Sequence, residues 1–150
     1  MRDARLEKLA DVLVNYSVGV QKDQLVRISG PPVAQPLVVE LYRRVLAAGG
    51  HPVVRMMPDE LQELFLKHGS DEQLKYLNPI QVFEYEKIDG SIGIWGEENT
   101  KALSNVDPAK IGLSQAARKP LLESFMKRAA DGKLRWVGTQ YPNQAAAQDA

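Results

Sequence analysis

The chain has 150 residues, 44% of them hydrophobic and 25% charged, a composition typical of one globular domain rather than a disordered segment. Its formal net charge is zero and it has no basic stripe, so we expect no nucleic-acid partner. It contains no cysteine, which excludes disulfides and thiolate sites, and no apolar stretch approaches a membrane span or a signal peptide, so we expect a cytoplasmic protein without a membrane partner.

Helix and strand patterns alternate from the start of the chain. Apolar residues at helical spacing predict a helix over 3–18, which Gly19 is placed to end. A strand is predicted over 25–28, a second helix over 36–48 and a second strand over 52–57. The residues expected to be buried are Leu6, Leu9, Ala10, Leu13 and Val14 in the first helix and Val38, Leu41, Tyr42 and Val45 in the second.

The middle of the chain is less regular. A helix is predicted over 59–67 and a short one over 71–77. Residues 79–87 fit either a strand or a helix, because their apolar residues have strand propensity without strict alternation. A third strand is predicted over 91–95. The side of the 59–67 helix expected to pack inward carries Leu61, Leu64 and Phe65.

The last third is mainly helical before a final strand. Asp107 and Pro108 form an N-cap followed by a first-turn proline, which begins a helical region over 107–131. We expect Pro120 to divide this region into two helices, because proline disfavours helix at the residue before it. A fourth strand is predicted over 134–137. The inner face of the second piece is expected at Leu121, Leu122, Phe125, Met126 and Ala129.

This order of elements predicts an α/β fold. Strands that alternate with helices are joined by helical crossovers and lie parallel. The predicted strands are short and mostly apolar, as expected when helices cover both faces of the sheet. We therefore predict an open, mostly parallel sheet of about four strands in the order 2-1-3-4, Rossmann or flavodoxin-like, in one domain over residues 1–150.

Ligands of such a sheet bind beyond the carboxyl ends of the strands. The loops there are polar and contain glycine or proline, although most such loops only turn the chain. No dinucleotide or Walker motif is present, so a nucleotide site is not expected. The loops concerned are 29–32, 57–59, 96–100 and 138–143.

Other candidate residues have ordinary structural explanations. His51 precedes a strand, at the wrong end for a ligand cleft, and His68 lies at a helix C-terminus, where it can face the helix dipole. The Glu97-Glu98 pair could act in acid–base chemistry or hold a hard cation, but neighbouring glutamates in a polar loop are usually solvated. We expect Trp95 and Trp136 to be core residues.

Six segments carry a resemblance to a known family: 24–30, 47–52, 89–100 and 134–142, with 118–120 and 125–130 also similar. They resemble, in order, the N-terminal part of the aminopeptidase T family, the M29 metallopeptidases. The resemblance implies an exopeptidase that removes N-terminal residues from peptides with a pair of divalent ions, zinc, cobalt or manganese. It also implies a homodimeric parent, and metal ligands in the C-terminal half of a much longer chain, so no metal ligand or catalytic residue is carried over.

The resemblance thus implies an N-terminal domain without its C-terminal catalytic domain. The helix-like stretch 144–150, which has no stop signal, fits a chain that continues. We expect this chain alone to be inactive, to hold no cofactor and to help wall the cleft for peptide substrate. The strand-end residues expected to contact substrate are Glu97, Asn99, Tyr141 and Asn143. The alternative is a stand-alone binding module without enzymatic activity, which binds its ligand through the same loops.

Overall fold

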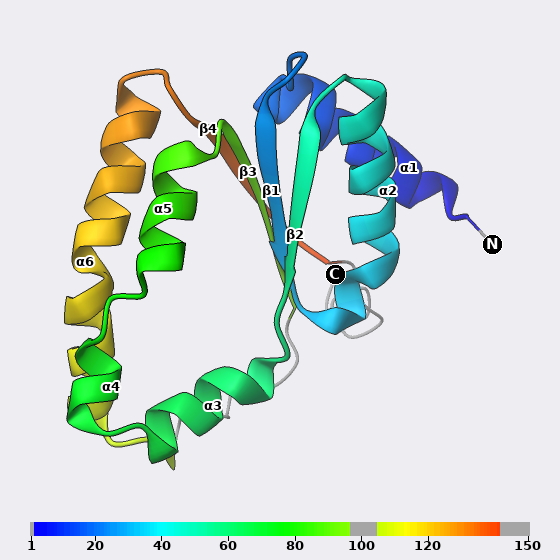
Figure 1. Ribbon diagram of the computed structural model, residues 1–150. Helices are drawn as coiled ribbons and strands as arrows, with labels where there is room; N and C mark the ends of the chain where they lie inside the picture. Colours follow the sequence, from blue (N-terminus) through cyan, green and yellow to red (C-terminus); the bar gives the residue numbers. More distant parts are fainter. Residues whose placement is uncertain (1, 97–104, 142–150) are drawn as a thin grey trace.

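The computed structural model describes residues 2–96 and 105–141. Its strands form one parallel sheet in the order β2-β1-β3-β4, which confirms the predicted fold class and strand order (Figure 1). Three strands are one or two residues longer than predicted, and β2 has the predicted length but begins one residue earlier. The strands are β1 (Leu25–Gly30), β2 (His51–Met56), β3 (Gly90–Trp95) and β4 (Arg135–Gln140).

Helices cover both faces of the sheet (Figure 1). The first face is covered by α1 (Ala4–Asp11), the π-helix η1 (Val12–Val18) and α2 (Gln35–Ala47), which follows the short turn η2 (Pro32–Ala34). The second face carries α5 (Pro79–Lys87) and the C-terminal half of α6 (Pro108–Ala130). Below them in Figure 1 lie α3 (Asp59–His68) and α4 (Asp71–Lys75).

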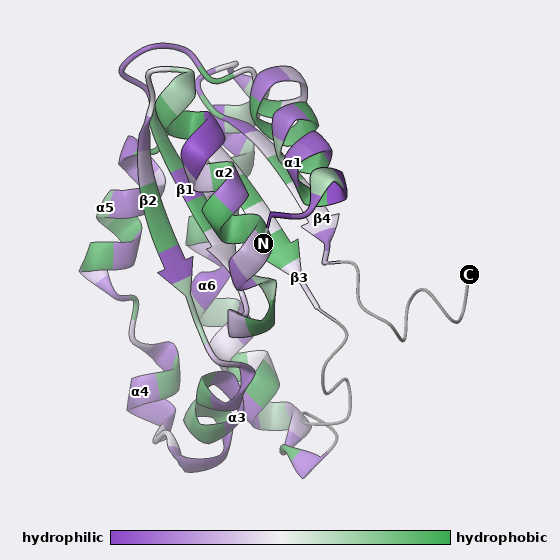
Figure 2. Cartoon of the chain, turned by 90° about the vertical axis from the view of Figure 1, so that its right-hand side faces the viewer, coloured by the Kyte–Doolittle hydropathy of each residue, from purple (hydrophilic) through white to green (hydrophobic). Residues whose placement is uncertain are grey.

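The main core lies between the sheet and α1, η1 and α2. Alternate residues of the two central strands point into this core. They are Val26 and Ile28 of β1 and Ile92 and Ile94 of β3. Figure 2 shows hydrophobic segments of these strands behind α2, separated by paler or hydrophilic ones. The helical residues predicted to be buried here are confirmed apart from the half-buried Leu9 and the exposed Tyr42; the buried ones are Leu6, Ala10, Leu13, Val14, Val38, Leu41 and Val45.

The second face has a smaller core that covers only part of the sheet. Tyr85 of α5 and Ile88, which follows that helix, pack with Leu121 and Phe125 of α6 and with Leu134, at the end of the sheet where the strands begin. The carboxyl halves of the strands are not covered by this cluster, so a hollow is left on that half of the face.

Residues 79–87 are helical, which resolves the open choice between strand and helix. The side chain of Asn78 accepts a hydrogen bond from the backbone N–H of Ile80 at 2.9 Å, and Pro79 occupies the first turn. A proline in the first turn loses no intrahelical hydrogen bond. This N-cap therefore decides the conformation of the segment.

The prediction that Pro120 divides the last helix is wrong, because α6 runs unbroken from Pro108 to Ala130. Pro120 is exposed, so water can satisfy the carbonyl groups that lose their partner there. The two halves of α6 pack against different neighbours. The first half packs with α4 around Leu74, and the second half packs with α5.

The inward side predicted for the 59–67 helix is also wrong. Leu61, Leu64 and Phe65 are exposed, and only Leu66 of α3 is buried, in a small cluster with Leu74. α3 touches the rest of the described chain mainly through α6, so most of its apolar residues have no neighbour to pack against. Leu122 and Met126 of α6 are likewise exposed rather than buried.

In the part of the chain that the structure describes, no helix has both the length and the hydropathy needed to cross a bilayer.

Candidate functional site

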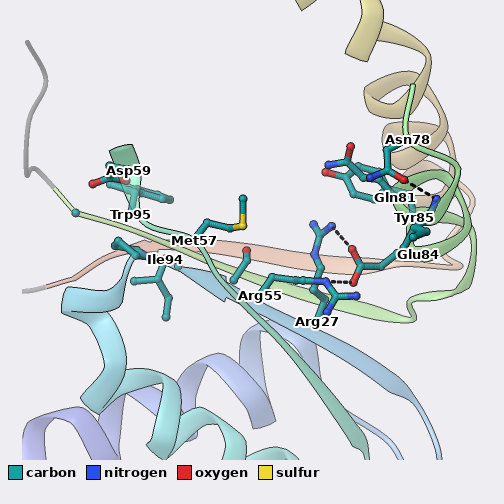
Figure 3. Close-up of a pocket in the computed structure, with 15 residues that line it drawn as sticks. Arg27, Arg55, Met57, Asp59, Asn78, Gln81, Glu84, Tyr85, Ile94 and Trp95 are labelled. Atoms are coloured by element: carbon teal, nitrogen blue, oxygen red, sulfur yellow. Dashed lines mark hydrogen bonds and ion pairs between the residues drawn. The ribbon is translucent and has the colours of Figure 1, made fainter. Parts of the chain in front are cut away.

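A cavity of about 660 Å³ opens at the carboxyl ends of β1, β2 and β3, on the face that carries α5 (Figure 3). This is the edge of a parallel sheet at which ligands are expected. Its volume lies within the usual range of small-ligand sites, about 300–1,000 Å³. The lining residues are Arg27, Ser29, Gly30, Pro31, Arg55, Met57, Asp59, Asn78, Ile80, Gln81, Glu84, Tyr85, Ile94, Trp95 and Gly96.

Small residues on the central strands leave room for this cavity. Ser29 of β1 is in register with Gly93 of β3, which is in register with Gly138 of β4. A Cβ atom at Gly93 would meet only Ser29 Oγ, at 3.9 Å. At Gly138 the space is taken, because a Cβ there would lie 2.5 Å from the indole ring of Trp95. The sheet is therefore open beside Ser29 and covered by an aromatic ring over β4.

Two arginines share one carboxylate at the α5 end of the cavity. Arg55 Nε lies 2.9 Å from Glu84 Oε1, and Arg27 Nη1 lies 3.7 Å from Glu84 Oε2. Arg27 also donates a hydrogen bond to Ser91 Oγ at 3.1 Å, and its guanidinium lies 4.6 Å from the centre of the Tyr85 ring. We call these five residues the arginine cluster. It ties α5 to three strands of the sheet.

The two arginines differ in their surroundings. The side chain of Arg27 is 12% exposed and that of Glu84 13%, whereas that of Arg55 is 48% exposed. Arg27 Nε is buried without a hydrogen-bond partner among the described residues. Glu84 balances only one of the two cations, so this end of the cavity carries one positive charge in excess. Asp59, the other acidic residue of the lining, lies at the opposite end (Figure 3).

Of the predicted substrate contacts, the structure describes Tyr141. It is half-buried against the core on the α1–α2 side, and its backbone N–H donates to the carbonyl oxygen of Trp95 at 2.7 Å. It follows β4 and does not line the cavity. Glu97, Asn99 and Asn143 lie outside the described residues, as does the Glu97-Glu98 pair, so their contact with substrate stays a prediction.

The described residues do not fit a two-ion centre. Within 2–96 and 105–141, no three histidine or acidic side chains converge in a way that could hold a metal ion. His51 is exposed at the start of β2, 3.4 Å from Asp23. His68 ends α3 and lines a separate hollow of about 490 Å³ with Leu64 and Phe65.

The tryptophans predicted to be core residues are about half exposed instead. Trp95 ends β3 at the rim of the cavity, and Trp136 lies beside Phe125 with ring centres 6.0 Å apart. Both occupy the face that α5 and α6 cover incompletely, which explains their exposure.

None of the five residues of the arginine cluster was predicted from the sequence as a site residue. A signal was present, since Arg27 interrupts the apolar run Leu25-Val26-Arg27-Ile28 of a central strand. A charge inside a strand covered on both faces is costly unless it has a partner. The partner, Glu84, lies on a segment whose conformation the sequence left open.

Comparisons with known proteins agree with this fold. The family model described as thermophilic metalloprotease (M29) matches residues 2–150. Among solved structures, wild-type AmpT from Thermus thermophilus is similar with a TM-score of 0.72 and 19% sequence identity, over 92% of this chain and 36% of that chain. Among curated proteins, none matches significantly. The chain thus spans about a third of AmpT and has the same fold over that part, and it belongs to the M29 family of thermophilic metalloproteases.

Proposed function

We propose that this chain is a non-catalytic N-terminal domain of a two-metal aminopeptidase, where it forms one wall of the peptide-binding cleft. Membership of a metalloprotease family supports the class of reaction. The observation that carries the wall role is the cavity at the carboxyl ends of β1, β2 and β3. The ions, zinc, cobalt or manganese, would polarise the scissile carbonyl and activate a water when bound. In this proposal their ligands lie outside the described residues, which do not fit such a centre.

The chemistry of the cavity suits a peptide. One end carries the arginine cluster, and the other carries Met57 and Trp95. Guanidinium groups bind carboxylates and carbonyl oxygens, while thioether and indole groups pack against apolar side chains. A peptide offers both kinds of group within a few ångströms of each other. We therefore favour the enzyme domain over a stand-alone binding module.

The exposed side of α3 supports the proposal that a second domain packs against this one. Leu61, Leu64 and Phe65 are all about half exposed on one short helix. Contiguous exposed apolar residues commonly mark an interaction surface. We propose that this side meets the C-terminal catalytic domain of a cytoplasmic parent enzyme, which by its resemblance to the family is a homodimer.

The wall role is tested in the longer enzyme that contains this domain. Alanine substitutions at Glu97, Asn99, Tyr141 and Asn143 are compared by kcat and KM on leucine anilide and on peptides of increasing length. The proposal predicts a higher KM for the longer peptides with little change in kcat on the anilide. Tyr16→Ala, at an 82% exposed tyrosine of η1, is the matched control for Tyr141→Ala. Unchanged kinetics in all four variants would remove the wall role.

A further inference from the structure

We infer that the cavity beside α5 binds the carboxylate of its ligand, with Arg55 as the main donor and Ser29 beside it. That the ligand is a peptide rests on the proposed function. The recognition of a carboxylate rests only on the residues of this cavity.

The two Nη groups of Arg55 are the donors that a ligand carboxylate can reach. The Nε of Arg55 lies 2.9 Å from Glu84 Oε1, and its two Nη groups form no hydrogen bond with the described residues. The side chain lines the cavity and is nearly half exposed, so a ligand can reach those groups. A guanidinium presents paired donors in a plane, the arrangement that matches the two oxygens of a carboxylate.

The balance of charge favours an anion at this end. Arg27 is fixed by Glu84, Ser91 and Tyr85, and its side chain is almost fully buried. Glu84 lies 2.9 Å from Arg55 and 3.7 Å from Arg27, so one carboxylate is shared by two cations and this end of the cavity keeps one positive charge in excess. An opposite charge brought into a partly desolvated site is attracted more strongly than one in bulk water.

The other lining residues of the cavity indicate which groups the ligand carries besides its carboxylate. Ser29 lies in register with Arg55 on the neighbouring strand, so its hydroxyl lies next to the arginine and can donate a second hydrogen bond. Met57, Ile80 and Trp95 line the remaining space. We therefore expect a carboxylate that sits next to an apolar side chain. It can be the C-terminal carboxylate of a peptide or an acidic side chain within it.

Peptide titrations of the 150-residue chain test this directly, with backbone N–H chemical shifts as the readout. The probes are Ala-Ala-Phe with a free C-terminus, the same peptide as its C-terminal amide, and acetyl-Ala-Glu-Phe amide. We expect the free acid to bind saturably and to shift Ser29 and Arg55, and the amide to bind at least about tenfold more weakly. If the glutamate-containing amide binds as tightly as the free acid, the acidic side chain is a second source of the carboxylate.

Two variants separate recognition from folding. Arg55→Gln should weaken binding of the free acid at least about tenfold and leave binding of the amide unchanged. Arg43→Gln, at an exposed arginine of α2 on the opposite layer, is the matched control and should change neither. Ser29→Leu places an apolar side chain on the floor of the cavity and removes no charged group, so it should weaken binding of the free acid at least about tenfold without lowering the melting temperature.

Equal binding of acid and amide, or equal effects of Arg55→Gln and Arg43→Gln, would overturn the inference. So would the absence of any saturable binding by the free acid. These results do not depend on turnover. The free acid and the amide could bind equally well while the four alanine variants still raise KM for long peptides. That pair of results would overturn carboxylate recognition and leave the proposed function standing.

Discussion

Gly112 and Gly132 both leave open space where a Cβ atom would be, but only Gly132 has a positive φ, of 74°. Gly112 lies inside α6, where alanine is favoured over glycine by about 1 kcal/mol. Gly132 follows the helix in the left-handed conformation, which costs a residue with a Cβ about 1 kcal/mol. We expect Gly112→Ala to raise the free energy of unfolding in urea and Gly132→Ala to lower it. Changes of the same sign in both variants would contradict this assignment of backbone conformations.

Glu40 gives the fold an acid-sensitive contact. It is buried on α2, and both its oxygens accept hydrogen bonds from Arg2, at 3.0 and 2.9 Å. These bonds, helped by the nearby charges of Arg43 and Arg44, hold the pKa of Glu40 below its ordinary value. A lowered pKa stabilises the fold above the unfolded-state pKa of glutamate, and that stability is lost as the pH falls through the folded-state value.

Arg2→Met should therefore reduce stability at neutral pH and make the loss of stability on acidification less steep. The measurement is urea unfolding at pH 7 and at successively lower pH values. Arg5→Met is the control and should leave the pH profile nearly unchanged. The pKa of Asp3 is lowered mainly by a hydrogen bond from the backbone N–H of Arg5, which this substitution keeps. Parallel pH profiles for Arg2→Met and the unmodified chain would contradict the role of the Arg2–Glu40 pair.

At the level of the elements, Arg128 joins α6 to the C-terminal end of α5. Its Nη1 donates to the carbonyl oxygens of Tyr85 and Ile88, both at 2.7 Å. These carbonyls end the helix and have no intrahelical partner. Arg128→Met keeps most of the apolar stem and removes both bonds, which should cost about 2 kcal/mol of unfolding free energy. Arg118→Met, at an exposed residue of the same helix, should cost much less, and an equal loss in both would exclude this contact.

The sequence predicted the elements whose patterns are decided locally. Four strands separated by helices permit few arrangements, so the parallel sheet followed from the alternation, and its order was taken from the usual doubly wound pattern. The faces of the first two helices followed from their apolar spacing. Pro120 was misjudged because a proline rule describes an isolated helix, whereas the two halves of α6 are each held by their own packing.

The site was harder to predict because it depends on how distant segments meet. Arg27 was visible as a charge within an apolar strand, but Glu84 belonged to a segment with two possible conformations. The apolar spacing predicted that Leu61, Leu64 and Phe65 of α3 and Trp95 of β3 would be buried. They are exposed instead, because little of the described chain packs on them. Such residues show an apolar pattern in the sequence without showing what covers them.

On the scale of the whole molecule, the two faces of the sheet have different roles. The face under α1, η1 and α2 holds the main core, and the other face is only half covered by α5 and α6. The uncovered half opens at the carboxyl ends of the strands, where the arginine cluster and Trp95 face the same cavity. One face thus stabilises the domain, and the other is available for a ligand.

The central claim is that this domain contributes a wall to an aminopeptidase without catalysing the reaction itself. The most direct measurement is hydrolysis of a leucine chromogenic amide by the 150-residue chain with added cobalt or zinc, beside a longer M29 enzyme that contains this domain. We expect no turnover above that of the metal alone, with an active longer enzyme. Metal-dependent turnover that rises in proportion to the concentration of the chain and stops with a chelator would contradict the claim.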